Sequence, residues 1–266
     1  MALSSLAPAR RRLFLVVLLV VVLAAVAVGG YFALRPDTTT HSVAQDRPGP
    51  VLLVPGYGGS TASLQVLATK LRQDGREAVV VATPGDGKGD LTDQARVLAQ
   101  AATDAMSRTG ATSVDVVGYS AGGLVARLWV ADLGGASVAR RVVTLGSPHH
   151  GTDIAALGAG LLPSLCPAAC QQMAPTSDLL RGLNAQRPTG PTFVSIWSTV
   201  DQVVTPPASA RLDGALNLTV QSVCAGSTVD HGALPSDPVS SNIVVTELAA
   251  GPPRALTAAD CTGLSR

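Results

Sequence analysis

Three residues far apart in the chain have the types and the order that nucleophilic acyl chemistry requires. Ser120 lies in the pentapeptide Gly118–Gly122 (GYSAG), which is a G-x-S-x-G pattern. Asp201 and His231 follow it along the chain. A serine hydroxyl is a weak nucleophile at neutral pH and needs a histidine base, which a carboxylate in turn orients. We therefore interpret Ser120 as the nucleophile, His231 as its base and Asp201 as the acid. The alternative is that GYSAG forms an ordinary glycine-rich turn.

Other residues could fill two of these roles. His149 and His150 follow another strand-like segment and are alternatives to His231 as the base. His41 lies in a polar stretch near the N-terminus, and we exclude it. Asp230 is the alternative acid, but as the direct neighbour of His231 it would need an unusual turn to reach the Nδ1 atom of that ring.

The residues around Ser120 favour the nucleophile. Val114–Val117 has the composition of a buried strand, and a helix-like run begins at Gly123. In a tight turn from strand to helix, small residues two positions to either side permit the strained backbone of the serine. The serine hydroxyl is then exposed over the N-terminus of the helix.

The negatively charged oxygen of a tetrahedral intermediate needs preorganised N–H donors. We expect one donor to be the backbone amide of Ala121, directly after Ser120. We expect the other to be the amide of Tyr57, in the glycine-rich segment 55–60 (PGYGGS) behind an apolar strand. A simple tight turn is the alternative for that segment.

Short apolar stretches alternate with amphipathic runs over most of the chain. The predicted strands are Val51–Val54, Glu77–Val81, Val114–Val117, Val142–Leu145, Thr192–Trp197 and Ala215–Val220. The predicted helices start at a Ser60 or Thr61 cap, at an Asp90 cap, and near Gly123, Ser177 and Asp237. This alternation, with its short links, predicts an α/β fold in which helices cover both faces of a mostly parallel sheet. Catalytic loops then collect at the carboxyl ends of the strands.

The alternation lapses between the fourth and fifth predicted strands. Residues 152–191 contain the apolar run Ile154–Leu162 and two of the four cysteines. We predict a small insertion that acts as a cap or lid over the site, with a plain helical connection as the alternative.

The N-terminal segment determines the cellular location. Leu13–Leu34 is uncharged and follows Arg10–Arg12. As a helix of about 33 Å it is long enough to cross a hydrocarbon core of about 30 Å. We expect residues 1–35 to be a signal-anchor, or else a signal peptide cleaved after Ala25–Ala27 (AVA). Either way the arginines stay inside and the remainder lies outside the cytoplasm, membrane-anchored or secreted.

We expect residues 36–49 to be a linker and residues 50–266 to be one catalytic domain. Of the 19 basic residues four lie in residues 1–35, so residues 36–266 carry 15 basic against 18 acidic groups, a formal charge of −3. No basic stripe is visible, and we expect no nucleic-acid partner. The histidines are too few for a convincing metal cluster. We expect a monomer without a cofactor.

Together the motifs resemble the bacterial triacylglycerol lipases (class 2 lipases) of the α/β-hydrolase superfamily, especially those of actinobacteria. The resemblance covers roughly residues 50–262. It rests on VPGYGGS (54–60), PGDGKGD (84–90), GYSAGGLVAR (118–127), GSPHHGT (146–152), STVD (198–201) and DH (230–231). It implies an α/β-hydrolase fold with Ser120, Asp201 and His231 as the catalytic triad. It also implies Tyr57 and Ala121 as the oxyanion hole.

We expect the cysteines to pair as Cys166–Cys170 and Cys224–Cys261, although four cysteines allow three connectivities. The first disulfide would pin a small loop of the insertion, provided that C-x-x-x-C is not helical throughout. The second would tie the C-terminal tail to the strand before the His231 loop and steady the base. Disulfides agree with an oxidising compartment.

The leading hypothesis is a serine esterase or lipase that cleaves a lipophilic acyl ester through an acyl-enzyme. An acyltransferase, thioesterase or peptidase could use the same residues, because the fold does not choose the leaving group. A hypothesis from another class is an exported, membrane-tethered binding or scaffold protein without turnover. The complete set of triad residues argues against it.

Overall fold

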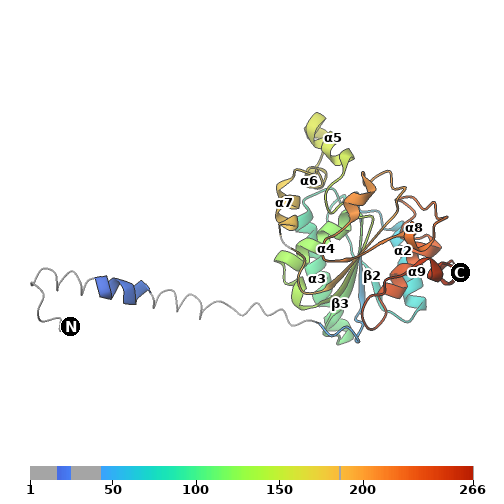
Figure 1. Ribbon diagram of the computed structural model, residues 1–266, viewed down its shortest axis with the longest axis horizontal. Coiled ribbons are helices and arrows are strands. Elements are labelled where there is room, and N and C mark those ends of the chain that lie inside the picture. Colours follow the sequence, from blue (N-terminus) through green and yellow to red (C-terminus); the bar gives the residue numbers. More distant parts are fainter. Residues whose placement is uncertain (1–16, 25–42, 186, 266) are drawn as a thin grey trace, which may run out of the picture. The chain divides into compact units, whose positions relative to one another are not determined.

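The computed structural model describes residues 17–24, 43–185 and 187–265 (Figure 1). The chain divides into two units, Met1–Thr39 and Thr40–Arg266. In the first unit, residues 17–24 form a helix. None of the helices in the described ranges is both long enough and apolar enough to cross a membrane. The rest of the expected anchor, the expected boundary after residue 35 and His41 lie outside the described residues.

The second unit is built on six parallel strands in the order β2-β1-β3-β4-β5-β6. The strands are β1 (Val51–Val54), β2 (Ala78–Val80), β3 (Val114–Tyr119), β4 (Ala139–Leu145), β5 (Thr192–Trp197) and β6 (Leu216–Thr219). Each coincides with a predicted strand to within a few residues. The predicted α/β class with a parallel sheet is confirmed.

Alternate side chains of the strands enter two separate apolar cores. The helices that matter here are α2 (Ala62–Gln73), α3 (Leu91–Thr109), α4 (Ala121–Asp132), α8 (Val220–Val223), α9 (Pro238–Glu247) and α10 (Cys261–Leu264). Leu52 and Val116 pack in the core with α3 and α4. Leu53 and Val117 pack in the core with α2 and α9. Helices therefore cover both faces of the sheet, as predicted (Figure 1).

The helix starts follow the sequence signals in part. The Asp90 side chain accepts a hydrogen bond from the Thr92 amide at 2.6 Å and caps α3, as predicted. Thr61 occupies the N-cap position of α2, but its side chain makes no capping hydrogen bond. Helix α4 begins at Ala121, two residues before the predicted start at Gly123, because the turn at the serine occupies a single residue.

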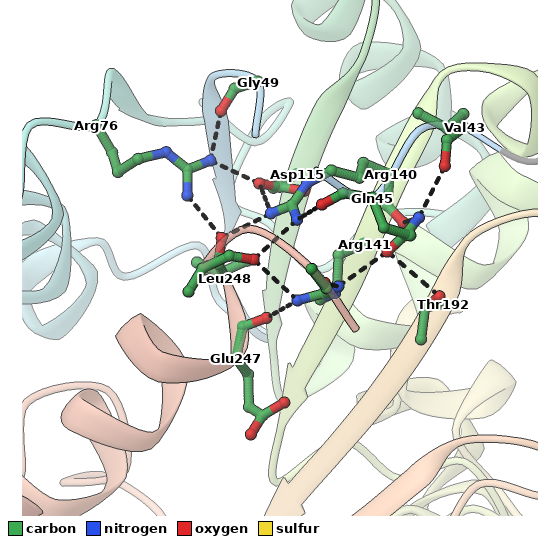
Figure 2. A network of polar contacts seen from close by, with 12 residues as sticks. Val43, Gln45, Gly49, Arg76, Asp115, Arg140, Arg141, Thr192, Glu247 and Leu248 are labelled. Atoms are coloured by element: carbon green, nitrogen blue, oxygen red, sulfur yellow. Dashed lines mark hydrogen bonds and ion pairs between the residues drawn. The ribbon is translucent and has the colours of Figure 1, made fainter. Parts of the chain in front are cut away.

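A buried network of charged side chains lies at the amino-terminal ends of the central strands (Figure 2). Arg140 donates from Nε and Nη2 to the two carboxylate oxygens of Asp115, at 2.8 and 2.6 Å. Arg76 donates from Nη2 to the same carboxylate at 2.6 Å. The side chains of Asp115 and Arg140 are fully buried. Strand β4 therefore starts at Ala139, three residues before the predicted start, because both arginines of the strand have partners inside the protein.

Most other arginine donors of this network go to main-chain carbonyls. Arg140 donates to the carbonyl oxygens of Gln45 and Ala249, both at 3.0 Å. Arg141 donates to the carbonyl oxygen of Glu247 and to the side-chain oxygen of Gln45. Residues 43–49, which we predicted as linker, thus pack on β4 beside the turn that follows α9 (Figure 2).

The segment after β4 contains α5 (Asp153–Leu161), a short 3-10 turn η3 (Pro163–Leu165), α6 (Ala168–Gln172) and α7 (Asp178–Asn184). Helix α5 projects from the rest of the unit (Figure 1). Of its residues only Ala155 is buried. The large apolar side chains of α5 and of the turn behind it are 53–74% exposed: Ile154, Leu157, Leu161, Leu162 and Leu165.

Both expected disulfides are present, Cys166–Cys170 and Cys224–Cys261. Cys166 has an extended backbone before α6, so the C-x-x-x-C segment is not helical throughout. The second disulfide ties α10 to the end of α8. Two disulfides indicate that the protein resides in an oxidising, extracytoplasmic compartment.

Candidate active site

Ser120 alone forms the turn between β3 and α4. Strand β3 ends at Tyr119 and α4 begins at Ala121, and Ser120 has φ +53° and ψ −124°. A positive φ at a residue with a side chain is strained and persists only where the surroundings impose it. Here the Ser120 amide donates to the Leu145 carbonyl of the neighbouring strand at 2.8 Å.

Two glycines make this turn possible. A Cβ atom on Gly118 would lie 2.6 Å from the carbonyl oxygen of Gly122. A Cβ atom on Gly122 would lie 2.3 Å from the carbonyl oxygen of Val54. Real Cβ atoms essentially never come within 3.0 Å of another heavy atom. The two outer positions of the motif therefore need glycine because α4 packs directly on β1 and β3.

The structure brings Ser120, His231 and Asp201 into one hydrogen-bonded chain. His231 Nε2 lies 3.0 Å from Ser120 Oγ, and its Nδ1 lies 2.7 Å from Asp201 Oδ2. The other carboxylate oxygen of Asp201 accepts from the amides of Val203 and Val204 at 2.8 and 2.9 Å. Ser120, His231 and Asp201 are all buried. They come from the carboxyl ends of β3, β5 and β6, where a parallel sheet gathers its loops.

The alternative residues lie elsewhere. The Asp230 carboxylate accepts from the Ala233 amide at 2.9 Å, at the surface. His149 is fully buried, its Nε2 lies 3.1 Å from Thr144 Oγ1, and burial lowers its pKa well below the ordinary value. His150 is exposed. Within the described part of the chain, no group of three or more His, Cys, Asp or Glu side chains could hold a metal ion.

Tyr119 supports the histidine and was not singled out by the sequence. Its hydroxyl donates to the His231 carbonyl at 3.1 Å, and the two rings lie 5.2 Å apart between centroids. Burial, together with the nearby charges of Asp201 and Asp230, raises the pKa of Tyr119 to about 12, so it stays a donor. Its place inside the G-x-S-x-G motif is the only sequence signal for this role.

Gly146 was also missed. It has φ +55° at the end of β4, and a Cβ atom there would lie 3.1 Å from His231 Nδ1 and 3.2 Å from Asp201 Oδ2. A larger residue would therefore press on the acid–histidine pair. The position of this glycine directly after an apolar strand is the signal that could have identified it.

The two expected oxyanion donors lie next to the serine. Ala121 is the first residue of α4, and Tyr57 follows β1. A Cβ atom on Gly56 would lie 2.9 Å from Ser120 Cβ, so the loop that carries Tyr57 passes close to the serine. Among the hydrogen bonds of the described residues, neither of these two amides donates to a protein acceptor.

A pocket of about 320 Å³ opens beside Ser120 and Tyr57. The rest of its lining is mostly apolar: Pro148, Thr152, Ile154, Ala155, Gly158, Leu162, Leu165, Cys166, Cys170, Met173, Val203 and Val204. A larger cavity of about 630 Å³ lies between α4 and α7, lined by groups such as Arg127 and Asp178. It contains none of the candidate catalytic residues, so the smaller, apolar pocket is the one that belongs to the site.

Solved structures with the same architecture include lipases. Aspergillus fumigatus lipase B aligns with a TM-score of 0.64 at 20% identity over 85% of this chain and 62% of that chain. This chain therefore spans less than two thirds of the fungal enzyme. Mature Bacillus licheniformis lipase BlEst2 aligns with a TM-score of 0.62 at 18% identity over 80% of this chain and 96% of that chain. These similarities confirm the predicted α/β-hydrolase fold.

The family comparison is more specific. A family model described as palmitoyl protein thioesterase matches residues 50–185, just over half of the chain. The matched part includes Ser120, Ala121 and the loop with Tyr57. No curated protein matches the sequence. The chain therefore belongs to the palmitoyl protein thioesterase family and has the α/β-hydrolase fold of ester hydrolases.

Proposed function

We propose that the protein is a serine hydrolase of the class 2 lipase type, which cleaves carboxylic esters of lipophilic acyl groups. One observation carries the proposal: the hydrogen-bonded chain from Asp201 through His231 to Ser120 ends at an apolar pocket. The nucleophile, its base and a place for an acyl chain thus adjoin one another.

In the first half-reaction, Ser120 Oγ forms a bond to the acyl carbon while its proton passes to His231 Nε2. The electron pair of the carbonyl moves to its oxygen, which accepts hydrogen bonds from the backbone amides of Tyr57 and Ala121. The N-terminus of α4 adds a favourable partial charge. His231 then protonates the leaving alcohol, and the acyl-enzyme remains.

In the second half-reaction, a water molecule loses its proton to His231 and attacks the acyl-enzyme. The acid leaves as the proton returns to Ser120 Oγ. Asp201 holds the imidazole with Nδ1 protonated and stabilises the imidazolium that forms twice per cycle. Two main-chain donors to Asp201 keep its second oxygen occupied, which leaves Oδ2 to orient the ring.

A thioester is the second candidate substrate, because the matching family model is that of palmitoyl protein thioesterases. The same acyl-enzyme would form from either kind of ester. A thiol has a pKa of about 8.5, so a thiolate leaves with less help from His231 than an alkoxide does.

The location and domain plan belong to the same proposal. We infer that residues 13–34 anchor the protein to the cell membrane or are cleaved from a secreted form. Residues 50–266 then act outside the cytoplasm as a monomeric catalytic domain, and residues 152–191 act as its lid. The disulfides and the exposed apolar side chains of α5 support this arrangement.

The test is hydrolysis of p-nitrophenyl esters from acetate to palmitate, and of an acyl-coenzyme A, by the full chain in detergent. Ser120→Ala should lower kcat/KM for both ester types by about 10⁴-fold or more while leaving the protein folded. A fluorophosphonate should label the wild type and not the variant. Unchanged hydrolysis by Ser120→Ala would assign the reaction to another nucleophile. A folded wild type that neither turns over nor is labelled would support the binding protein instead.

A further inference from the structure

Helix α5 has a glycine where a helix interior disfavours one. Gly158 lies in the middle of α5, at a cost of about 1 kcal/mol relative to alanine. A Cβ atom on Gly158 would lie 3.2 Å from Cys170 Sγ and 3.4 Å from Cys166 Sγ. The distance to Cys170 Sγ is shorter than most contacts of a real Cβ atom, so the absence of a side chain at residue 158 lets α5 approach the disulfide this closely.

The disulfide itself is attached to the main body of the domain. Cys170 lies within α6, and Gln172 at the end of α6 hydrogen-bonds to both Asp90 and the Leu91 amide at the start of α3. Helix α5, by contrast, buries only Ala155. The disulfide is therefore the fixed surface on which the exposed helix rests.

This contact forms part of the wall of the pocket at Ser120. Gly158 and both cysteines line the pocket. Ile154 and Leu162, four residues to either side of Gly158, line it as well. Residues four apart lie on one face of a helix, so Ile154 and Gly158 share the face of α5 that meets the disulfide and faces the pocket. Leu162 directly follows the helix.

The size of the pocket suits a long aliphatic group. An apolar cavity of about 150 Å³ holds benzene, which corresponds to roughly 25 Å³ per carbon atom. On that scale the 320 Å³ pocket has room for roughly 12 carbons. Because Ser120 lines the pocket, an acyl group bonded to its Oγ starts within the pocket and continues along the apolar walls.

We propose that the contact between Gly158 and the Cys166–Cys170 disulfide sets the depth of an acyl pocket and so selects medium and long acyl chains over short ones. This inference rests on the proposed function, because it requires acylation at Ser120. Gly158 and the disulfide are specificity-determining groups and take no part in bond making. Separating α5 from the disulfide, or filling the gap between them, changes the space that the chain occupies.

The first test compares Gly158→Leu with Gly160→Leu, a matched control on the same helix. Gly160 is exposed, and no atom lies within 4 Å of a Cβ built there. The readout is the ratio of kcat/KM for p-nitrophenyl dodecanoate to that for p-nitrophenyl acetate, so the leaving group is constant. Gly158→Leu should lower this ratio by about 10–100-fold, the range that one or two methylenes determine in an apolar pocket. Gly160→Leu should leave it at the wild-type value.

The second test removes each disulfide in turn. Cys166→Ser/Cys170→Ser should lower the dodecanoate-to-acetate ratio, because α5 loses its support. Cys224→Ser/Cys261→Ser also removes a cross-link and lowers stability, but it should leave the ratio unchanged. Thermal unfolding measures the folded fraction of each variant. Gly158→Ala provides a milder change if Gly158→Leu does not fold.

The outcomes separate the inference from the proposed function. If the wild type shows no hydrolysis that depends on Ser120, the proposed function fails. If hydrolysis depends on Ser120 but the ratio is the same in the wild type, the Gly158 variants and Cys166→Ser/Cys170→Ser, the inference fails alone. It also fails if Gly160→Leu shifts the ratio equally, or if the Gly158 variants respond to the length of the alcohol instead of the acyl chain.

Discussion

The two ends of the parallel sheet carry opposite kinds of side chains. At the carboxyl end, the segment from Thr152 to Gln172 contains a single charged residue, Asp153, and leaves large aliphatic side chains exposed. At the amino end, Asp115 and Arg140 are fully buried with their charges paired (Figure 2). Apolar groups face solvent at one end, and charges are hidden from it at the other.

The comparison shows how stability and function are divided between the ends. The buried pair of Asp115 and Arg140 resists change, because removing one partner leaves the other charge buried and unpaired. Covering an exposed apolar surface with a binding partner is favourable by roughly 25 cal/mol for each Å² buried. We therefore expect the amino end to contribute mainly to stability, and under the proposed function the apolar surface at the carboxyl end would meet the acyl group.

The largest expected effect is a loss of activity on changing a residue at the carboxyl end of the sheet. Asp201→Asn should lower kcat by about 10⁴-fold, because an amide does not hold the His231 tautomer that accepts the serine proton. The stability in urea should change little by comparison. Steady-state hydrolysis of p-nitrophenyl butyrate measures kcat, and Asp230→Asn is the matched control with kcat near that of the wild type. A larger loss in Asp230→Asn would reverse the assignment of the acid.

The next effect is a loss of stability on changing a residue at the amino end of the sheet. Asp115→Asn should lower the free energy of unfolding by about 3–5 kcal/mol, because Arg140 and Arg76 lose their counter-charge. The kcat of the folded fraction should stay near the wild-type value. Denaturant titration measures the change, with Asp93→Asn as control: its exposed pair with Arg96 should contribute less than about 1 kcal/mol. A loss of stability in Asp115→Asn no greater than in Asp93→Asn would contradict the idea that the amino end of the sheet contributes mainly to stability.

A smaller effect depends on pH. Burial raises the pKa of Glu247 from 4.5 to about 7. The hydrogen bond from the Arg254 amide and the charges of Arg141 and Arg254 lower this pKa, but by less than burial raises it. Its Oε1 atom has no hydrogen-bond partner among the described residues, and its carboxyl group points away from Arg141 (Figure 2). The folded state thus favours the protonated form. The stability from this group is fully present below pH 4.5 and is lost as the pH rises through about 7.

Glu247→Gln mimics the neutral form and should remove this loss. Relative to wild type, the variant should gain stability from pH 5 to pH 8, on the order of 1 kcal/mol at the upper end. Thermal unfolding across that pH range measures the difference. The surface variant Glu77→Gln should show no such growing difference. A constant offset for Glu247→Gln would mean that the acid is ionised throughout.

The smallest effect lies at the active site. Tyr119→Phe removes the hydroxyl that donates to the His231 carbonyl, a neutral hydrogen bond that contributes about 1 kcal/mol to stability. The kcat should fall far less than in Asp201→Asn. Thermal unfolding and ester hydrolysis measure both quantities, and Tyr57→Phe is the stability control because its ring is exposed. Equal losses of stability in the two variants would mean that the Tyr119 hydroxyl does not stabilise the His231 segment.

Much of the fold and the site could be predicted because the signals are local. The strand Thr192–Trp197 and the buried face of α2 follow from apolar periodicity alone. Ser120 follows from a motif that the strand-to-helix turn requires. The pairing of Asp201 and His231 was anticipated from their order along the chain, and the structure brings their side chains together.

What could not be predicted depends on contacts between distant parts of the chain. The predicted strand began at Val142 and left out Arg140 and Arg141. Arg140 pairs with the carboxylate of Asp115, 25 residues earlier, and Arg141 donates to the Glu247 carbonyl, more than 100 residues later. Gly158 gives no sign of its role until the disulfide lies against it. Apolar composition set residues 152–191 apart from the alternating segments, but it did not tell which of their side chains line the pocket.

Helix α6 is attached to the start of α3 by two hydrogen bonds of one side chain. Gln172 donates from Nε2 to Asp90 Oδ2 at 2.6 Å and accepts at Oε1 from the Leu91 amide at 2.8 Å. At the other end of this segment, just before α5, Thr152 Oγ1 donates to the Val203 carbonyl at 2.7 Å. Both borders are thus held by residues that lie outside α5 and its turn.

We therefore expect residues 153–171 to be replaceable as a unit. A different segment placed between the same two attachment points would meet an unchanged sheet and an unchanged Ser120. We therefore expect relatives of this protein to differ most in this stretch, in length as well as in composition. Substrate range can then diverge during evolution by insertion and deletion here, while the sheet and its charged end stay under constant selection.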